Sequence, residues 1–174
     1  MKIICSKSSL LKSVSIALKA VPSKTTMPIL ECILMDATTN QIKFTTNDME
    51  LGIETIVEGT IEEKGKVALD AKIFYEIIRR LPDNDVTIKT DDKYAATITC
   101  EKAKFNIPGK SGEDFAYLPM IEKDEPLTIS QYTLKEMIRQ TIFSIAVNEN
   151  NKLMTGELFE IKNNCCLLYT SPSP

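Results

Sequence analysis

The chain has 174 residues and a formal net charge of −3, with 21 lysines and arginines against 24 aspartates and glutamates. The sequence contains no histidine, so the commonest general base and a principal metal ligand are missing. Its five cysteines include no C-x-x-C pair, which disfavours zinc and thiol-redox motifs. We therefore predict a protein without catalytic residues, metal or cofactor.

The N-terminal segment MKIICSKSSLLKS lacks the sustained apolar region and cleavage site of a signal peptide. No stretch approaches the ~18 apolar residues of a membrane-spanning helix. Scattered cysteines in odd number suit a reducing compartment, so we expect a cytoplasmic protein with no membrane contact. Because the net charge is negative, nucleic-acid binding would require lysine and arginine to cluster on one face.

In chain order, the first elements are a strand, a helix and three strands. KIICS predicts the first strand, and apolar residues at helical spacing in SSLLKSVSIALKAV predict a helix with Ser8 or Ser9 as N-cap. After the breaker PSKTTMP, three strands are predicted, in LECILMDA, QIKFTTN and LGIETIVEG. Turns are predicted between them at TTN and NDME.

The same order then repeats. KVALD predicts a strand, Asp70 can cap the helix AKIFYEIIRRL, and three strands are predicted in DVTIKT, YAATITC and KFNIP. A third beginning follows a polar, proline-bearing stretch, with LTIS as a strand and a T-x-x-E capping box, Thr133 to Glu136, opening a helix. The three strand starts are spaced about 60 residues apart, which indicates an internal repeat. We predict an α+β fold of repeated β-α-β-β-β units, with two helices packed on antiparallel sheet in each domain.

The polar faces of the predicted helices carry basic residues. Lys12 and Lys19 project together from the first helix, Arg79 lies opposite the apolar stripe of the second, and Lys135 and Arg139 flank the stripe of the third. Charged helix faces are often simply solvated. Their repetition on equivalent helices weakens this explanation without excluding it.

Five stretches, in order, resemble successive motifs of the bacterial sliding clamp family, the β subunit of DNA polymerase III. They are TTMPILECILMDA, FTTNDMELGIE, VALDAKIFYEIIRRLP, IPGKSGEDFAYLP and QTIFSIAVNENNKLMTGELFEI. The resemblance implies the DNA-clamp fold and a ring-forming homodimer that encircles duplex DNA regardless of sequence. It implies a non-catalytic processivity factor that tethers the replicative polymerase, with a second clamp subunit, the polymerase and the clamp loader as protein partners.

The resemblance also implies roles for individual residues. Lys24, Asn148 and Lys152 match positions that contact DNA in the family, in addition to the basic helix faces. Positions of the family's subunit interface correspond to Ile73, Ile77, Leu81, Phe105 and Ile107, some of which must also serve the core. Asp48 and Glu50 match a structural corner between two strands, where Asn-Asp favours a turn, rather than a metal or catalytic site.

The resemblance covers the chain to about Lys162. It implies a first domain over residues 1–119, a linker over 120–126 and an incomplete middle domain over 127–164. The end, NNCCLLYTSPSP, does not resemble the family, and we interpret residues 165–174 as a non-native tail on a truncated clamp. The alternative is a non-enzymatic interaction module that shares the clamp fold but does not encircle DNA, and a test of DNA binding separates the two.

Overall fold

The computed structural model describes residues 1–117, 128–146, 152–162 and 165–170. The chain divides into two units, Met1–Met120 and Ile121–Pro174, each described here by itself. In the first unit the elements are β1 Lys2–Ser6, α1 Lys7–Ala17, a 3-10 turn Leu18–Ala20, β2 Cys32–Asp36, β3 Ile42–Asn47, β4 Gly52–Val57, β5 Gly59–Glu63, β6 Lys66–Asp70, α2 Ala71–Arg80, β7 Asp85–Thr90, β8 Ala96–Cys100, β9 Ala103–Ile107, β10 Gly109–Ser111 and a 3-10 turn Gly112–Asp114.

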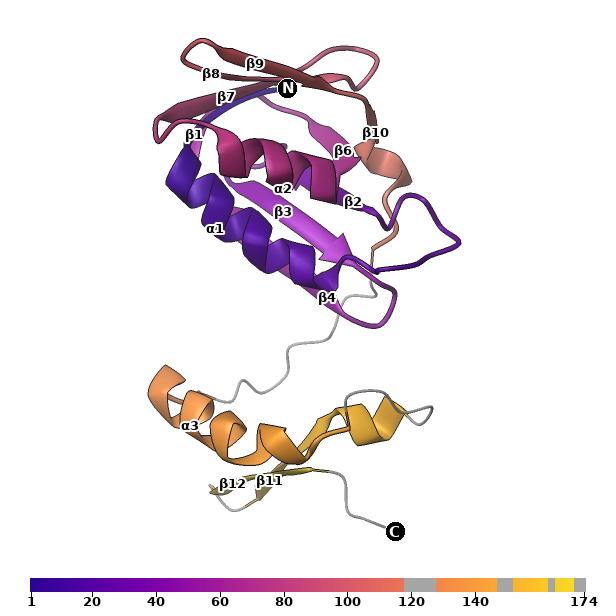
Figure 1. Ribbon diagram of the computed structural model, residues 1–174, viewed down its shortest axis with the longest axis vertical. Coiled ribbons are helices and arrows are strands. Elements are labelled where there is room, and N and C mark those ends of the chain that lie inside the picture. Colours follow the sequence, from indigo (N-terminus) through magenta and orange to yellow (C-terminus); the bar gives the residue numbers. More distant parts are fainter. Residues whose placement is uncertain (118–127, 147–151, 163–164, 171–174) are drawn as a thin grey trace. The chain divides into compact units, whose positions relative to one another are not determined.

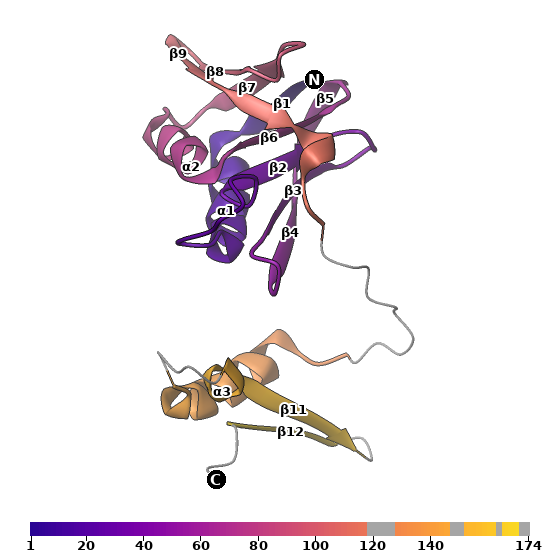
Figure 2. The same cartoon turned by 90° about the vertical axis from the view of Figure 1, so that its right-hand side faces the viewer.

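These strands form two antiparallel sheets, in the orders β5-β1-β7-β8-β9 and β10-β6-β2-β3-β4. Helices α1 and α2 lie side by side on the same side of the strands (Figures 1 and 2). The two halves of the unit are interleaved, because each sheet combines the first and last strands of one half with the three middle strands of the other. The predicted repeat is therefore present, but neither half forms a sheet of its own.

Each half contains five strands, one more than the predicted four. The run predicted as a single strand from Leu51 to Gly59 ends at Val57, and β5 begins at Gly59. β4 is the edge of one sheet, whereas β5 pairs with β1 in the other, with Cys5 opposite Gly59. The chain thus changes sheets at Gly59, and hydrophobic alternation cannot show this because both strands are short and partly exposed. β10 is the matching extra strand of the second half and pairs with β6.

The main core lies among both sheets and both helices. Phe44 of β3 and Phe74 of α2 are fully buried and pack edge to face, with ring centroids 6.0 Å apart. The predicted stripes of α1 and α2 supply buried Leu10, Val14 and Ile78. Apolar burial of this kind is the principal stabilising contribution to the fold.

Side-chain caps begin all three α-helices of the described residues, and one of the three predicted caps is confirmed. Asp70 caps α2 and accepts a hydrogen bond from the Ile73 amide at 2.8 Å. The predicted caps Ser8 and Ser9 are wrong, because α1 begins earlier and Ser6 accepts from the Ser9 amide. The predicted box at Thr133 is also wrong, since Ser130 caps α3. In both cases an upstream serine reaches the third helical amide first.

The corner between β3 and β4 is a turn, as predicted. Asp48 accepts hydrogen bonds through Oδ1 from the amides of Glu50, at 2.9 Å, and Leu51, at 2.7 Å. Met49, between Asp48 and Glu50, adopts φ = 76°, in the left-handed region that disfavours a residue with a Cβ atom. The carboxylate of Asp48 is therefore occupied in closing the hairpin.

Replacing Met49 by glycine is expected to raise the free energy of unfolding by about 0.5–1 kcal/mol, because glycine adopts positive φ without the Cβ penalty. The Met49 side chain is 50 % exposed, so little packing is lost. Urea unfolding followed by circular dichroism measures the change. Met49→Ala is the matched control, because it removes the same side chain but keeps Cβ; an equal gain in both variants would refute the backbone explanation.

The second unit contains α3 Gln131–Thr141, 3-10 turns at Ile142–Ser144 and Lys152–Thr155, and the strands β11 Glu157–Lys162 and β12 Cys165–Thr170. The two strands form an antiparallel hairpin with Glu157 opposite Thr170, so residues 165–170, interpreted as the start of a tail, pair with β11. Residues 128–130 of the strand predicted in LTIS are not in a strand, and the predicted linker 120–126 lies outside the described residues. No helix in the described ranges is long and apolar enough to cross a membrane.

Candidate nucleic-acid interface

The outward face of α1 carries two of the predicted basic residues. Lys12 and Lys19 are exposed, seven residues apart, with Lys19 in the 3-10 turn that continues the helix. Buried Leu10, Val14 and Ala17 occupy the opposite face, so core packing holds the two lysines towards solvent. Lys24, in the connection to β2, is also exposed. Among the described residues, no carboxylate lies within 4.0 Å of these three ammonium groups.

Arg79 on α2 is arranged differently, because it is paired on its own helix. Its guanidinium donates to Glu76 at 2.7 Å, and Arg80 donates to the same carboxylate at 3.2 Å. The hydrogen bond from Arg79 is the main cause that lowers the pKa of Glu76, so the carboxylate remains ionised near neutral pH. One of the two positive charges is neutralised locally, and α2 offers less unpaired charge than the sequence indicates.

Lys72 is an exposed cation on α2 that the sequence analysis did not single out. It lies seven residues before Arg79, the same spacing that separates Lys12 from Lys19. Residues seven apart are two helical turns apart and share a face. The seven-residue spacing from Arg79 could have identified Lys72 as a second exposed cation on the same face of α2.

The other predicted DNA-contacting residues belong to the second unit. Lys135 on α3 is exposed, and Arg139 donates to Glu136 at 2.7 Å. Asn148 lies outside the described residues, and Lys152 begins a 3-10 turn but its side chain is not described. The residues predicted to contact DNA are thus divided between the two units. Those of the helices in the first unit lie on or next to the adjacent helices α1 and α2.

The predicted subunit-interface residues separate into surface and core. Ile73 is 51 % exposed and Phe105 is 39 % exposed, and with half-buried Ile77 they line an apolar hollow of about 300 Å³ between α2 and β9. Leu81 and Ile107 are instead buried core residues, 3 % and 2 % exposed. These two are the positions among the predicted five that serve the core, and the subunit contacts of all five remain a prediction. β9 is also the last strand of its sheet, so its outer edge is open to a further strand.

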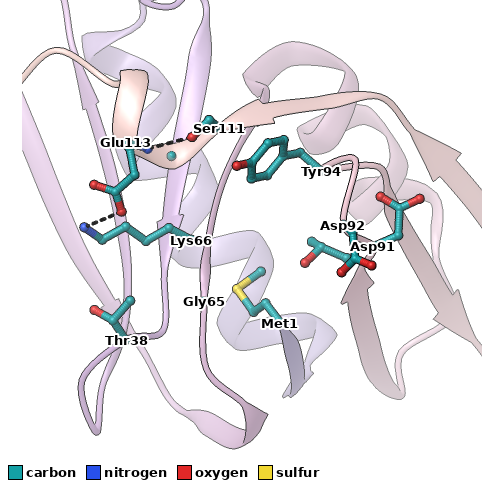
Figure 3. Close-up of a pocket in the computed structure, with 11 residues that line it drawn as sticks. Met1, Thr38, Gly65, Lys66, Asp91, Asp92, Tyr94, Ser111 and Glu113 are labelled. Carbon is teal, nitrogen blue, oxygen red and sulfur yellow. Dashed lines mark hydrogen bonds and ion pairs between the residues drawn. The ribbon is translucent and has the colours of Figure 1, made fainter.

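A separate cavity of about 430 Å³ lies where several strand ends meet, beside Met1, Lys66, Tyr94, Ser111 and Glu113 (Figure 3). The ammonium of Lys66 is 3.5 Å from Glu113, whose amide donates to the Ser111 hydroxyl at 3.3 Å. Opposite charges therefore pair in the wall of this cavity. Lys12 and Lys19, in contrast, have no such partner among the described residues. In the described part of the chain, no three potential metal-ligating side chains converge.

The interleaved β-α-β halves, with two adjacent helices bearing basic residues and two five-stranded sheets, define a protein with the DNA-clamp fold. The chain belongs to the DNA polymerase III beta subunit family, whose N-terminal domain matches residues 1–119. The beta sliding clamp of Bacillus subtilis is 35 % identical over 172 residues, which cover 94 % of this chain and 46 % of that protein. The beta sliding clamp of Synechocystis is 35 % identical over 164 residues, 90 % of this chain and 42 % of that protein.

Solved structures agree with this assignment and confirm the predicted fold. The crystal structure of a putative DNA polymerase III beta subunit from Eubacterium rectale shares 67 % sequence identity, with a TM-score of 0.90 over 97 % of this chain and 46 % of that one. The sliding clamp structure from B. subtilis shares 34 % identity with a TM-score of 0.89, covering 98 % of this chain and 47 % of that one. The chain therefore spans under half the length of the relatives that it matches.

Proposed function

We propose that this chain is part of a sliding clamp that encircles duplex DNA and tethers the replicative polymerase in the cytoplasm, without catalysing a reaction. Family membership supports the proposal, and the observation that carries it is the set of exposed cations Lys12, Lys19 and Lys24, which have no carboxylate within 4.0 Å among the described residues. The absence of histidine and the pairing of the Asp48 carboxylate within a turn agree with a tether rather than an enzyme.

Long, exposed lysine side chains suit this task physically. Their attraction to phosphate does not depend on base sequence and is weakened by salt, since binding releases condensed counterions. Phosphate contacts position a protein on DNA without reading its sequence. A tether that must move along DNA needs attraction of this loose kind.

We further propose that the hollow formed by Ile73, Ile77 and Phe105 binds a second clamp subunit, beside the open edge of β9. Partly exposed apolar side chains next to an unpaired strand edge favour a partner that adds both apolar contacts and backbone hydrogen bonds. Lys72 and Arg80 flank the hollow and supply charged groups at its margin. The polymerase and the clamp loader are the other partners that this role requires.

The chain itself is expected to bind short duplex DNA weakly, with equal affinity for unrelated sequences. Replacing Lys12, Lys19 and Lys24 together by alanine is expected to reduce the slope of log K against log salt concentration by about 3, since each phosphate contact contributes about 0.9. Fluorescence anisotropy of labelled duplexes, titrated at several salt concentrations, measures the slope.

The matched control removes three lysines from the sheet surface, by changing Lys89, Lys102 and Lys104 to alanine. All three are exposed on β7, on β9 or in the turn before β9, so the net charge changes equally. This control is expected to leave the slope nearly unchanged. An equal loss in both triple variants would show that the helix face is not the binding surface. No salt-dependent binding at all would favour the interaction module that does not encircle DNA.

A further inference from the structure

The sheet β10-β6-β2-β3-β4 is covered on both of its faces. Ile33 and Met35 of β2 face the main core, whereas Cys32 and Leu34 belong to a second, smaller cluster with Ala68 of β6. An antiparallel sheet commonly has one face packed and one face in water. The segment 111–117, here called the strap, covers this second face together with the partly buried Ile29.

The strap is anchored by one aromatic side chain. Phe115 is 3 % exposed and packs against Cys32, Leu34 and Ala68. The 3-10 turn before it lies against β6 and β2 (Figure 2). At Gly112 the contact is so close that a Cβ atom would stand 2.6 Å from Cβ of Lys66. Only a residue without a side chain permits the strap to lie this near the sheet.

Few other interactions hold the strap beyond its first residue, Ser111, which ends β10 and pairs with Val67 of β6. The side-chain Nδ2 of Asn47, a residue that is 1 % exposed, donates to the Ala116 carbonyl at 2.5 Å, and Glu113 forms a 3.5 Å ion pair with Lys66. The Glu113 side chain is 79 % exposed, so its ion pair is screened by solvent and contributes little. The small cluster beneath Phe115 is separate from the main core, since no buried side chain belongs to both.

We propose that the strap is a separately opening cover, which detaches from the sheet while the main core stays folded and so controls access to Cys32. Segments with few buried apolar contacts open locally at a smaller free-energy cost than global unfolding. Phe115 is the only large apolar side chain of the strap that is fully buried among the described residues, whereas the main core joins two helices and two sheets. This inference concerns the first unit alone and does not depend on DNA binding.

The cysteines of this unit provide the readout. Cys32 is 4 % exposed beneath the strap, whereas Cys5 and Cys100 lie in the main core, 2 % and 1 % exposed. Burial raises the pKa of the Cys32 thiol and raises that of Cys5 to about 12, so each thiol reacts only after it becomes exposed. Cys32 therefore reports strap opening, and the other two report opening of the core.

The experiment is native-state alkylation of the full chain with iodoacetamide at pH 8, with each labelled cysteine identified by peptide mass spectrometry over time. In the unmodified protein, labelling of Cys32 is expected to change little with urea below the unfolding transition. Labelling of Cys5 is expected to rise steeply, because global opening exposes far more surface. If the labelling rate of Cys32 rose with urea concentration as steeply as that of Cys5, the proposal would be overturned.

Phe115→Ala is expected to raise the Cys32 rate about 100-fold, as the loss of a buried phenylalanine implies, and to change Cys5 and Cys100 less than about threefold. Tyr117→Ala is the control, since Tyr117 packs on Phe115 edge to face but is 52 % exposed; an increase at Cys32 of at most about tenfold is expected. An unchanged Cys32 rate in Phe115→Ala, or equal increases at all three cysteines, would refute a separately opening strap.

Discussion

Replacing Phe74 by alanine is expected to lower the free energy of unfolding of the first unit by about 3–5 kcal/mol. Phe74 is fully buried on α2 and packs edge to face on Phe44 of β3, with an interplanar angle of 84°. The substitution removes this contact and leaves a cavity that the two sheets can fill only partly. Domains are stabilised by only about 5–15 kcal/mol, so the loss is a large fraction of the total. Urea unfolding followed by far-ultraviolet circular dichroism measures it.

Phe105→Ala is the matched control for this prediction. It deletes the same atoms from a phenylalanine that is 39 % exposed on β9. We expect a loss of less than about 1 kcal/mol, because partly exposed side chains contribute little to stability. A similar cost for both variants would mean that Phe105 serves the core and that the proposed apolar hollow is not free to bind a subunit.

Gly59→Ala is expected to lower the free energy of unfolding by about 2–3 kcal/mol, because the added methyl group overpacks the point where the chain changes sheets. A Cβ at Gly59 would stand 2.5 Å from the Ile4 carbonyl oxygen and 2.5 Å from Sγ of Cys5. The carbonyl belongs to β1, which is paired on both sides, with β5 and with β7. The clash therefore cannot be relieved by rotating a side chain. A decrease in Tm of about 10 °C is the corresponding thermal measurement.

Gly52→Ala provides the comparison for this substitution. Gly52 is exposed at the start of β4, also in a strand at the edge of its sheet. We expect a change of less than about 0.5 kcal/mol, as for other surface substitutions. If both glycines tolerated alanine equally, the close approach of β5 to β1 would not be a constraint on the fold.

The sequence alone determined the features that depend on neighbours along the chain. Hydrophobic spacing predicted α1 and α2, the Asp70 side chain predicted the start of α2, and the NDME letters predicted the turn that Asp48 closes. The exposed face of α1 followed in the same way, because helical geometry places Lys12 and Lys19 opposite the apolar stripe. The five ordered motifs identified the family.

Only the tertiary structure decided which strands pair and which residues remain at the surface. The exchange of strands between the two halves, the change of sheet at Gly59, and the burial of β2 on both faces all depend on residues distant in sequence. The same holds for the predicted interface positions, since Leu81 and Ile107 are buried whereas Ile73 and Phe105 are exposed. Periodicity shows that a residue is apolar on one face of its own element, but burial depends on what the rest of the chain packs against that face.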